Sequence, residues 1–291
     1  MSLREDVKRS GQAAKIQLNP VEETLLMVLY LRVRDAASPN PLLGDIYAQH
    51  VINKVDCDFT RSIFTLDDRY VKYIAGRGRQ IDVWCQDFVD RHDDQPVTVL
   101  HLACGLDSRN LRINRKSTVR WIDVDRPQVV SLRERLIETP PGDYRLVTAD
   151  VVNEDDWLHN IPDDRPTMII MEGLTMYLAP EKGFALFRKL LGHFHQGYLA
   201  FDTIGSVTVA FTSFLEAFRQ SKAVIRWGMD DPKVIMALDP RLKLRDIVYL
   251  HDFMQTGPFG KNGVPLFGGW TPLVSLMPGF RKNGQFLLLE F

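Results

Sequence analysis

The 291-residue chain lacks the cysteine content of a disulfide-stabilised or zinc-binding protein. Its three cysteines, Cys57, Cys85 and Cys104, are an odd number and form no CxxC motif. This usage excludes a disulfide framework and a zinc knuckle, and it is typical of reduced thiols in a cytoplasm. We therefore expect no metal site and a cytoplasmic location.

Long apolar runs and an excess of charge of one sign are also missing. The longest early apolar run, LLMVLYL at residues 25–31, is far shorter than the ~20 residues of a membrane span, and the first ten residues contain no signal-peptide core. Lys and Arg number 36 against 37 Asp and Glu, a formal net charge of −1. This balance favours neither nucleic acid nor an anionic membrane as a partner, so we expect a small-molecule ligand. It leaves the oligomeric state open.

The hydrophobic pattern predicts an α/β fold. Between the expected strands, residues 126–138 and 180–194 carry apolar residues at helical spacing. This alternation is typical of βαβ units, so we expect a mostly parallel sheet with helices on both faces. Short apolar, β-rich runs mark the strands, at 97–103, 120–125, 144–150, 167–173 and 198–203, with two late strands at 242–250 and 285–291.

Helical signals flank this core. A helix over residues 19–37 is indicated by Asn19 as N-cap and Pro20 at the first helical position. A second helical stretch, residues 67–91, contains GRGR at 76–79, where we expect the two glycines to interrupt the helix. After the fifth strand, residues 206–220 have the amphipathic pattern of a helical lid.

The turn after the first strand, ACGLDSR at 103–109, lies where a nucleotide approaches the backbone of an open parallel sheet. Gly105 is the only glycine of this turn, so the GxGxxG fingerprint of a pyrophosphate-binding loop is missing. A nucleoside without phosphates therefore fits the turn better than NAD does. An NAD-dependent oxidoreductase, which would share the sheet, stays an alternative.

Carboxylates follow the carboxyl ends of the next three strands. Asp125 or Asp123 closes the second strand, Asp150 the third and Glu172 the fourth. Acids gathered at one edge repel each other unless a ligand brings hydrogen-bond donors and positive charge. S-adenosylmethionine brings both, as ribose hydroxyls, an adenine amino group, an ammonium and a sulfonium. The pattern thus indicates this cofactor.

Four motifs in order, HLACGLDSR, WIDVDRP, ADVVNEDDW and IIMEGLTMYL, resemble those of the leucine carboxyl methyltransferase family. Upstream, LRVRDAASPNPLLGDIYA and RGRQID resemble its amino-terminal signature, so the similarity covers roughly residues 20–205. The branch that the chain resembles most is the tetracenomycin-type O-methyltransferases of polyketide biosynthesis. The resemblance implies a class I, Rossmann-like methyltransferase fold with a seven-stranded sheet, and methyl transfer from S-adenosylmethionine to an oxygen.

The resemblance also implies roles for single residues. Arg32 is a second candidate cation beside the methionyl carboxylate, and the family usually has glycine where Ala103 stands. The cofactor contacts that it implies are Arg77 with the methionyl carboxylate, Gly105 beneath the methionyl part, Asp125 with the ribose hydroxyls, Asp150 and Val151 with the adenine edge, and Glu172 with the ammonium and sulfonium. Tyr177, of the same motif as Glu172, is expected to line the pocket as a catalytic candidate.

The acceptor decides whether a base is needed. His251, followed by Asp252 after a late strand, is a candidate base for a phenol, whereas a carboxylate is already ionised near pH 7. We expect a small aromatic or polyketide-like acid, with a carboxyl oxygen preferred over a phenolic one. Methylation of a protein carboxyl terminus and a non-catalytic, cofactor-binding relative stay open, because a carboxylate at a strand end is often only a helix cap.

These expectations define one methyltransferase domain over residues 1–291. Its expected parts are an N-terminal helical cap at 1–95, a cofactor-binding core at 96–205, a lid and acceptor insertion at 206–240, and C-terminal strands with an acceptor loop at 241–291.

Overall fold

A seven-stranded sheet forms the centre of the protein. The computed structural model describes residues 20–61, 64, 66–211, 224–250, 252–253, 282 and 284–291. The strand order is β3-β2-β1-β4-β5-β7-β6, and β7 is antiparallel to both of its neighbours. The mostly parallel seven-stranded sheet is confirmed. Its strands are β1 (Val97–Leu102), β2 (Val119–Asp125), β3 (Tyr144–Thr148), β4 (Thr167–Met171), β5 (Gly197–Ile204), β6 (Lys243–Tyr249) and β7 (Gly284–Glu290).

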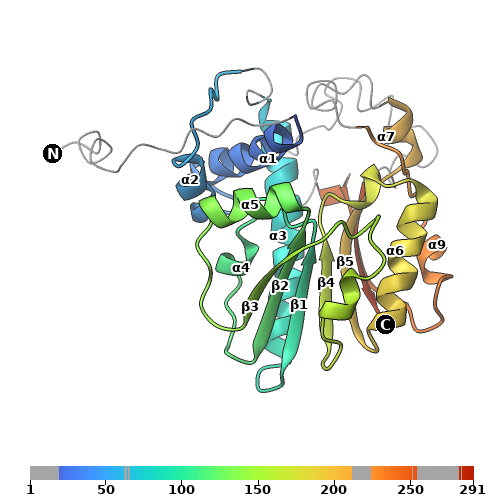
Figure 1. Ribbon diagram of the computed structural model, residues 1–291. Coiled ribbons are helices and arrows are strands. Elements are labelled where there is room, and N and C mark those ends of the chain that lie inside the picture. Colours follow the sequence, from blue (N-terminus) through green and yellow to red (C-terminus); the bar gives the residue numbers. More distant parts are fainter. Residues whose placement is uncertain are drawn as a thin grey trace.

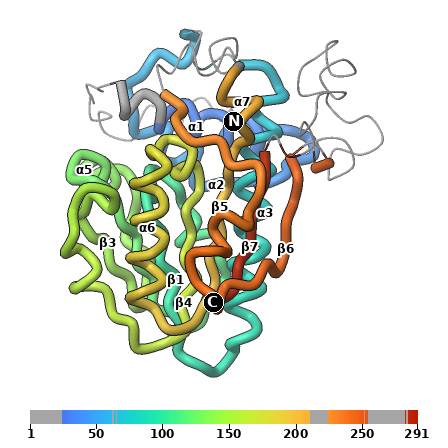
Figure 2. The backbone as a smooth tube through the Cα atoms, turned by 90° about the vertical axis from the view of Figure 1, so that its right-hand side faces the viewer, coloured from blue at the N-terminus to red at the C-terminus, as the bar shows by residue number. Residues whose placement is uncertain are grey.

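Helices cover both faces of this sheet, as the pattern predicts. Val97 and Val99 of β1 pack in the core cluster of α3 (Asp68–Arg91), whereas Leu100 and Leu102 pack in the cluster of α6 (Pro180–His193). Figure 2 shows the sheet between these two helices. The shorter elements beside them are α4 (Arg109–Arg112), α5 (Pro127–Leu136), α7 (Ser206–Phe211), α9 (Lys233–Met236) and the 3-10 turns η2 (Trp157–Asn160) and η3 (Thr175–Tyr177).

Helix α3 is continuous, so the expected interruption at residues 76–79 is wrong. The glycines instead permit close packing. A Cβ on Gly76 would lie 2.3 Å from Cε1 of Phe253, and one on Gly78 would lie 3.2 Å from Cδ2 of Leu43. The ~1 kcal/mol that each glycine costs a helix is offset by the apolar face that α3 buries. The two glycines thus bring the helix close to its neighbours on either side of Arg77.

Two helices lie over the carboxyl ends of the parallel strands (Figure 1). They are α1 (Pro20–Ala36), which begins at the predicted proline, and α2 (Ile46–Ile52). The carboxylate of Asp35 fixes the loop between them by accepting the backbone N–H groups of Leu42, Leu43 and Gly44 at 2.9–3.0 Å. This arrangement carries charged residues of the N-terminal region to the sheet edge that the strand-end acids occupy.

Part of the predicted acceptor region lies outside the described residues. Helix α7 forms the start of the expected lid, while 212–223 and His251 are outside the part that the structure describes. Cys85 and Cys104 are buried free thiols. In the described ranges, no helix is both long and apolar enough to span a membrane.

Candidate active site

Arg77 and Glu172 meet directly at the carboxyl edge of the sheet. Arg77 projects from the middle of α3, and Glu172 follows the last residue of β4. Nε of Arg77 donates to Oε1 of Glu172 at 3.0 Å, and both side chains are less than a tenth exposed. The structure thus joins two of the residues to which the resemblance gives cofactor contacts.

Asp202, in the strand β5, completes the surroundings of Arg77. Its Oδ2 accepts a hydrogen bond from Nη1 of Arg77 at 3.2 Å, and its Oδ1 accepts the backbone N–H of Gly173 at 2.6 Å. Burial raises the pKa of Asp202, although the positive charge of Arg77 opposes the rise. The guanidinium group therefore lies between two buried carboxylates.

Glu172 is the acid on which further arginines converge. Its carboxylate accepts from Arg32 at 2.9 Å and from Arg109 as well as from Arg77. Burial alone would raise the pKa of Glu172, but Arg32, Arg109 and Arg77 together hold it well below its ordinary value. Glu172 is therefore ionised near neutral pH.

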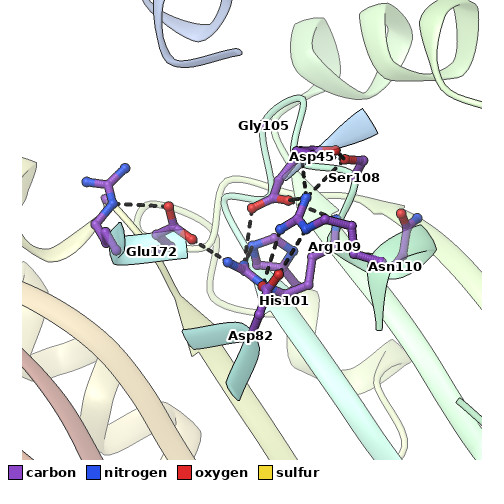
Figure 3. Close-up of polar contacts among 12 residues, drawn as sticks. Asp45, Asp82, His101, Gly105, Ser108, Arg109, Asn110 and Glu172 are labelled. Carbon is purple, nitrogen blue, oxygen red and sulfur yellow. Dashed lines mark hydrogen bonds and ion pairs between the residues drawn. The ribbon is translucent and has the colours of Figure 1, made fainter. Parts of the chain in front are cut away.

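These contacts belong to a larger buried network, which we call the edge ion cluster. Figure 3 shows its centre, where Arg109 lies among Glu172, Asp82 and His101. Four arginines and five acids give it a formal charge of −1, and no side chain is more than 9% exposed. Its members are Arg32, Asp45, Arg77, Asp82, Asp107, Arg109, Arg112, Glu172 and Asp202.

The cluster explains why motifs far apart in the chain occur together. Arg32 and Asp45 come from the N-terminal signature, Asp82 from RGRQID and Arg109 from the turn motif. Buried charges are tolerated only when they are paired and hydrogen-bonded, so each motif supplies partners for another. The network holds α1, α3 and α4 against the edge of the sheet.

Gly105 and Asp125 form a second pair of predicted site residues. The carboxylate of Asp125, at the end of β2, accepts the Gly105 N–H at 2.7 Å and the Arg126 N–H at 2.8 Å. Gly105 has a φ of +54°, and a Cβ there would lie 3.0 Å from Leu25. Burial raises the pKa of Asp125. The backbone of the turn thus passes close beside the acid.

Asp123, the other acid of this strand, belongs to the interior. It is fully buried and accepts hydrogen bonds from Trp121, Asn110, Arg133 and Tyr144. Burial would raise its pKa, but Arg133 and further donors lower the pKa to about 2. Of the two acids of DVD, Asp125 is therefore the one with oxygens next to the turn.

Asp150 and Val151 lie beside Asp125, because Ala149 donates its N–H to the Asp125 carbonyl at 2.9 Å. The Asp150 carboxylate accepts the N–H groups of Val152 and Asn153 at 3.1 Å, so it caps the turn after β3. Val151 is buried in the core cluster of α6. Asp150 therefore acts as a cap, the alternative role expected of an acid at a strand end. The hydrogen bond of Ala149 to Asp125 keeps it at the carboxyl edge of the sheet.

Two tyrosines adjoin Arg77. Tyr73 lies one helical turn before it on α3, with its ring centroid 5.5 Å from the guanidinium carbon. Burial raises the pKa of Tyr73 to about 12 and also raises the pKa of Tyr177, in η3. Both phenols are protonated near neutral pH and can donate hydrogen bonds.

Sequence reasoning missed Asp202, Tyr73 and most of the edge ion cluster. Asp202 carried a signal, because a single acid inside an otherwise apolar strand needs a buried partner. Tyr73 carried another, since it precedes Arg77 by four residues and so shares its helix face. Neither signal identifies the partner, which comes from a distant segment.

The turn residue Ala103 has a strained backbone conformation. Its φ is +50°, and Ala103 is the one residue other than glycine with positive φ among those that the structure describes. This left-handed conformation costs an L-residue ~1–2 kcal/mol. The chain therefore accepts backbone strain at this turn.

Comparison with known proteins agrees with this geometry. Residues 25–191 match the family model of leucine carboxyl methyltransferase. The chain is 38% identical over 231 residues to the tetracenomycin polyketide synthesis O-methyltransferase TcmP of Streptomyces glaucescens, covering 79% of this chain and 83% of that protein. It is 36% identical over 264 residues to the S-adenosyl-L-methionine-dependent methyltransferase dpfgK of Gibberella zeae, covering 84% and 88%.

Solved structures share the fold. A DUF574 family protein of Streptomyces avermitilis superposes with a TM-score of 0.56 at 13% identity, covering 93% of this chain and 99% of that one. A methyltransferase of Thermobifida fusca, described as putative in its name, gives a TM-score of 0.50 at 16% identity, covering 91% and 93%.

The fold and these relatives define an S-adenosylmethionine-dependent methyltransferase. The chain belongs to the leucine carboxyl methyltransferase family, and the predicted similarity to the tetracenomycin-type branch is confirmed.

Proposed function

We propose that this methyltransferase methylates an oxygen of a small aromatic or polyketide-like acid, with a carboxyl oxygen as the preferred acceptor. The similarity to TcmP over most of both chains supports a polyketide-like acceptor. The observation that carries the proposal is the Arg77–Glu172 ion pair at the carboxyl edge, beside two protonated phenols. We infer that this ion pair binds the cofactor and that the neighbouring phenols donate hydrogen bonds to the acceptor.

The residues at this edge fit the cofactor by their chemistry. S-adenosylmethionine carries a carboxylate, an ammonium, a ribose diol and an adenine, and when bound it supplies an electrophilic methyl group on sulfur. A buried guanidinium matches the carboxylate, and a buried acid with a lowered pKa matches the ammonium. Asp125 uses one acceptor site on each oxygen for backbone N–H groups, which leaves capacity for ribose hydroxyls.

We assign the roles residue by residue. Arg77 binds the methionyl carboxylate, with Arg32 as a second cation, and Glu172 binds the ammonium. Tyr177 lines the acceptor side, and His251 stays a candidate base for a phenolic acceptor, in a position outside the described residues. The remaining cofactor contacts that we propose are Gly105 beneath the methionyl part, Asp125 with the ribose, and Asp150 with Val151 at the adenine edge.

Protonation supports the preference for a carboxyl oxygen. In the described part of the chain, Glu172 and Asp202, the acids that contact Arg77, already accept N–H groups. Tyr73 and Tyr177 hold their protons near neutral pH. A carboxylate acceptor arrives ionised and needs no base, so the enzyme mainly aligns it, and alignment contributes ~7–11 kcal/mol. Transfer also neutralises charge, which a water-poor site favours.

Two experiments test the proposal. The first is calorimetric titration with S-adenosylhomocysteine of the wild-type protein and of Arg77→Ala, with NAD as the competing ligand. We expect binding by wild type, at least ten-fold weaker binding by the variant, and no NAD binding. No heat with S-adenosylhomocysteine would reject the cofactor site.

The second experiment is transfer of an isotopically labelled methyl group to paired acceptors. Each pair consists of an aromatic acid and its methyl ester with the phenol left free. Label on the acid alone supports the carboxyl oxygen, whereas label on the ester assigns the phenol and makes His251 the first residue to test. Label on a carboxyl-terminal peptide would identify a protein acceptor, and binding without transfer would identify a non-catalytic relative.

The division of residues 1–291 into cap, core, lid and C-terminal strands, together with the cytoplasmic location, stays a prediction. Limited proteolysis with mass spectrometry tests the boundary expected near residue 206. Fractionation of the source cells tests the location.

A further inference from the structure

We propose that Asp202 is a positioning residue, which orients Arg77 and the turn after β4 for cofactor binding. This inference rests on the proposed function of Arg77 and assigns a role to an acid that the sequence motifs did not mark. Asp202 is fully buried in β5, two residues before the end of the strand. Its side chain contacts two other elements of the site, the helix α3 and the turn after β4.

The contacts of Asp202 connect the helix that carries Arg77 to the turn that carries Glu172. One carboxylate oxygen accepts Nη1 of Arg77 at 3.2 Å, and the other accepts the N–H of Gly173 at 2.6 Å. Its backbone carbonyl accepts the hydroxyl of Thr175, in η3, at 2.5 Å. One residue thus sets the relative positions of α3 and the 173–177 turn.

The turn is built for close approach to Arg77. Gly173 has a φ of +66°, a conformation that favours glycine, and a Cβ there would lie 3.3 Å from Nη2 of Arg77. With Glu172 on Nε and Asp202 on Nη1, the plane of the guanidinium is fixed. Because arginine has five N–H donors, it can serve both acids and a bound carboxylate at once.

The placement of Asp202 carries an electrostatic cost that a neutral residue would avoid. An ionised carboxylate without exposure loses its hydration, and pairing with a single guanidinium offsets only part of that loss. Asparagine has nearly the same shape and could accept the Gly173 N–H. Its amide group would, however, place N–H donors against the donors of Arg77. The contact with Arg77 is therefore what requires a negative charge at position 202.

The test is a double-mutant cycle read by calorimetric titration with S-adenosylhomocysteine. The variants are Asp202→Asn, Arg77→Ala and the double variant, with Asp246→Asn as the matched control. Asp246 also joins the sheet to α3, since it accepts Nε1 of Trp84 at 2.9 Å, but it lies on β6, away from the cluster. Asp202→Ser, which is smaller and keeps an oxygen for the Gly173 N–H, replaces Asp202→Asn if the latter is insoluble.

We expect Asp202→Asn to weaken binding about ten-fold, the size of one charge-assisted hydrogen bond. In the Arg77→Ala background the same change should have no further effect, because Asp202 acts through Arg77. The control should bind like wild type. Equal losses in both backgrounds, or wild-type affinity in the single variant, would overturn the inference while leaving the proposed function intact. Absence of binding by the wild-type protein would overturn both.

Discussion

Replacing Arg109 by methionine should destabilise the protein strongly, because it removes the central cation of the edge ion cluster. Arg109 has no exposed surface. It pairs with Asp82 at 2.6 Å, with Asp107 at 3.3 Å and with Glu172. Methionine keeps the apolar stem of the side chain but lacks the guanidinium group, so it leaves three buried acids with less positive charge.

The magnitude follows from what each acid retains. Asp82 and Asp107 each keep Arg112 at 2.9 Å, and Glu172 keeps Arg32 at 2.9 Å, so none of the three acids becomes fully unpaired. Removing one partner from a buried ion pair costs about 3–5 kcal/mol, and we expect a loss in this range. For a chain of this size, this corresponds to a Tm lower by about 6–20 °C.

Differential scanning fluorimetry at several pH values measures this loss. Burial would raise the pKa values of Asp107 and Glu172, but the arginines, Arg109 among them, lower both below their ordinary values. A lowered folded-state pKa contributes stability above the unfolded-state pKa, and that stability is lost as the pH falls below about 4. The difference in Tm between wild type and variant should therefore be largest near pH 7 and smaller toward pH 4.

Two further variants make this experiment specific. Arg109→Lys keeps the charge but not the planar fork, so its Tm should lie between those of wild type and Arg109→Met. Arg245→Met removes an exposed pair with Glu290 and should leave Tm unchanged. A Tm of Arg109→Met within 2 °C of wild type at pH 7 would refute the view that the cluster supports the fold.

Three other changes have definite expected outcomes. Ala103→Gly should raise the unfolding free energy by about 0.5–1 kcal/mol in urea titration, because it relieves the positive φ; a lower stability would contradict the strain. Gly76→Ala should lower the unfolding free energy by about 1–3 kcal/mol in the same assay, since its Cβ would lie 2.3 Å from Cε1 of Phe253. An unchanged urea midpoint would show that the ring moves freely. Burial would raise the pKa of Asp123, but Arg133 and other donors lower it to about 2, so the folding stability that its charge contributes should be lost between about pH 4 and pH 2. Asp123→Asn should lack this acid-dependent loss of stability, and an acid-unfolding profile identical to that of wild type would refute the assignment.

The alternation of apolar runs was sufficient to predict the sheet and its two helical layers. Each βαβ unit has a local period that the chain displays directly, and the acids Asp125, Asp150 and Glu172 are at or just after the ends of their strands. Their shared edge follows from parallel strands alone. The family resemblance rested on the same local motifs.

The GRGR segment shows where local pattern failed. Glycine lowers helix propensity, yet α3 continues through Gly76 and Gly78, because the neighbours Phe253 and Leu43 occupy the space that a Cβ would take. Those neighbours are distant in sequence. Propensity is a small local term, and tertiary packing outweighs it.

By itself, the sequence determined the class of fold, the family and the edge of the sheet where charge gathers, since these depend on local period and on short motifs. Only the tertiary structure decided the partners: Arg77 meets Glu172 across 95 residues and Asp202 across 125, and Asp123 turns to the interior while Asp125 meets Gly105. The reason is physical. A buried charge must find an opposite charge within hydrogen-bonding distance, and which one it finds depends on how helices and strands pack.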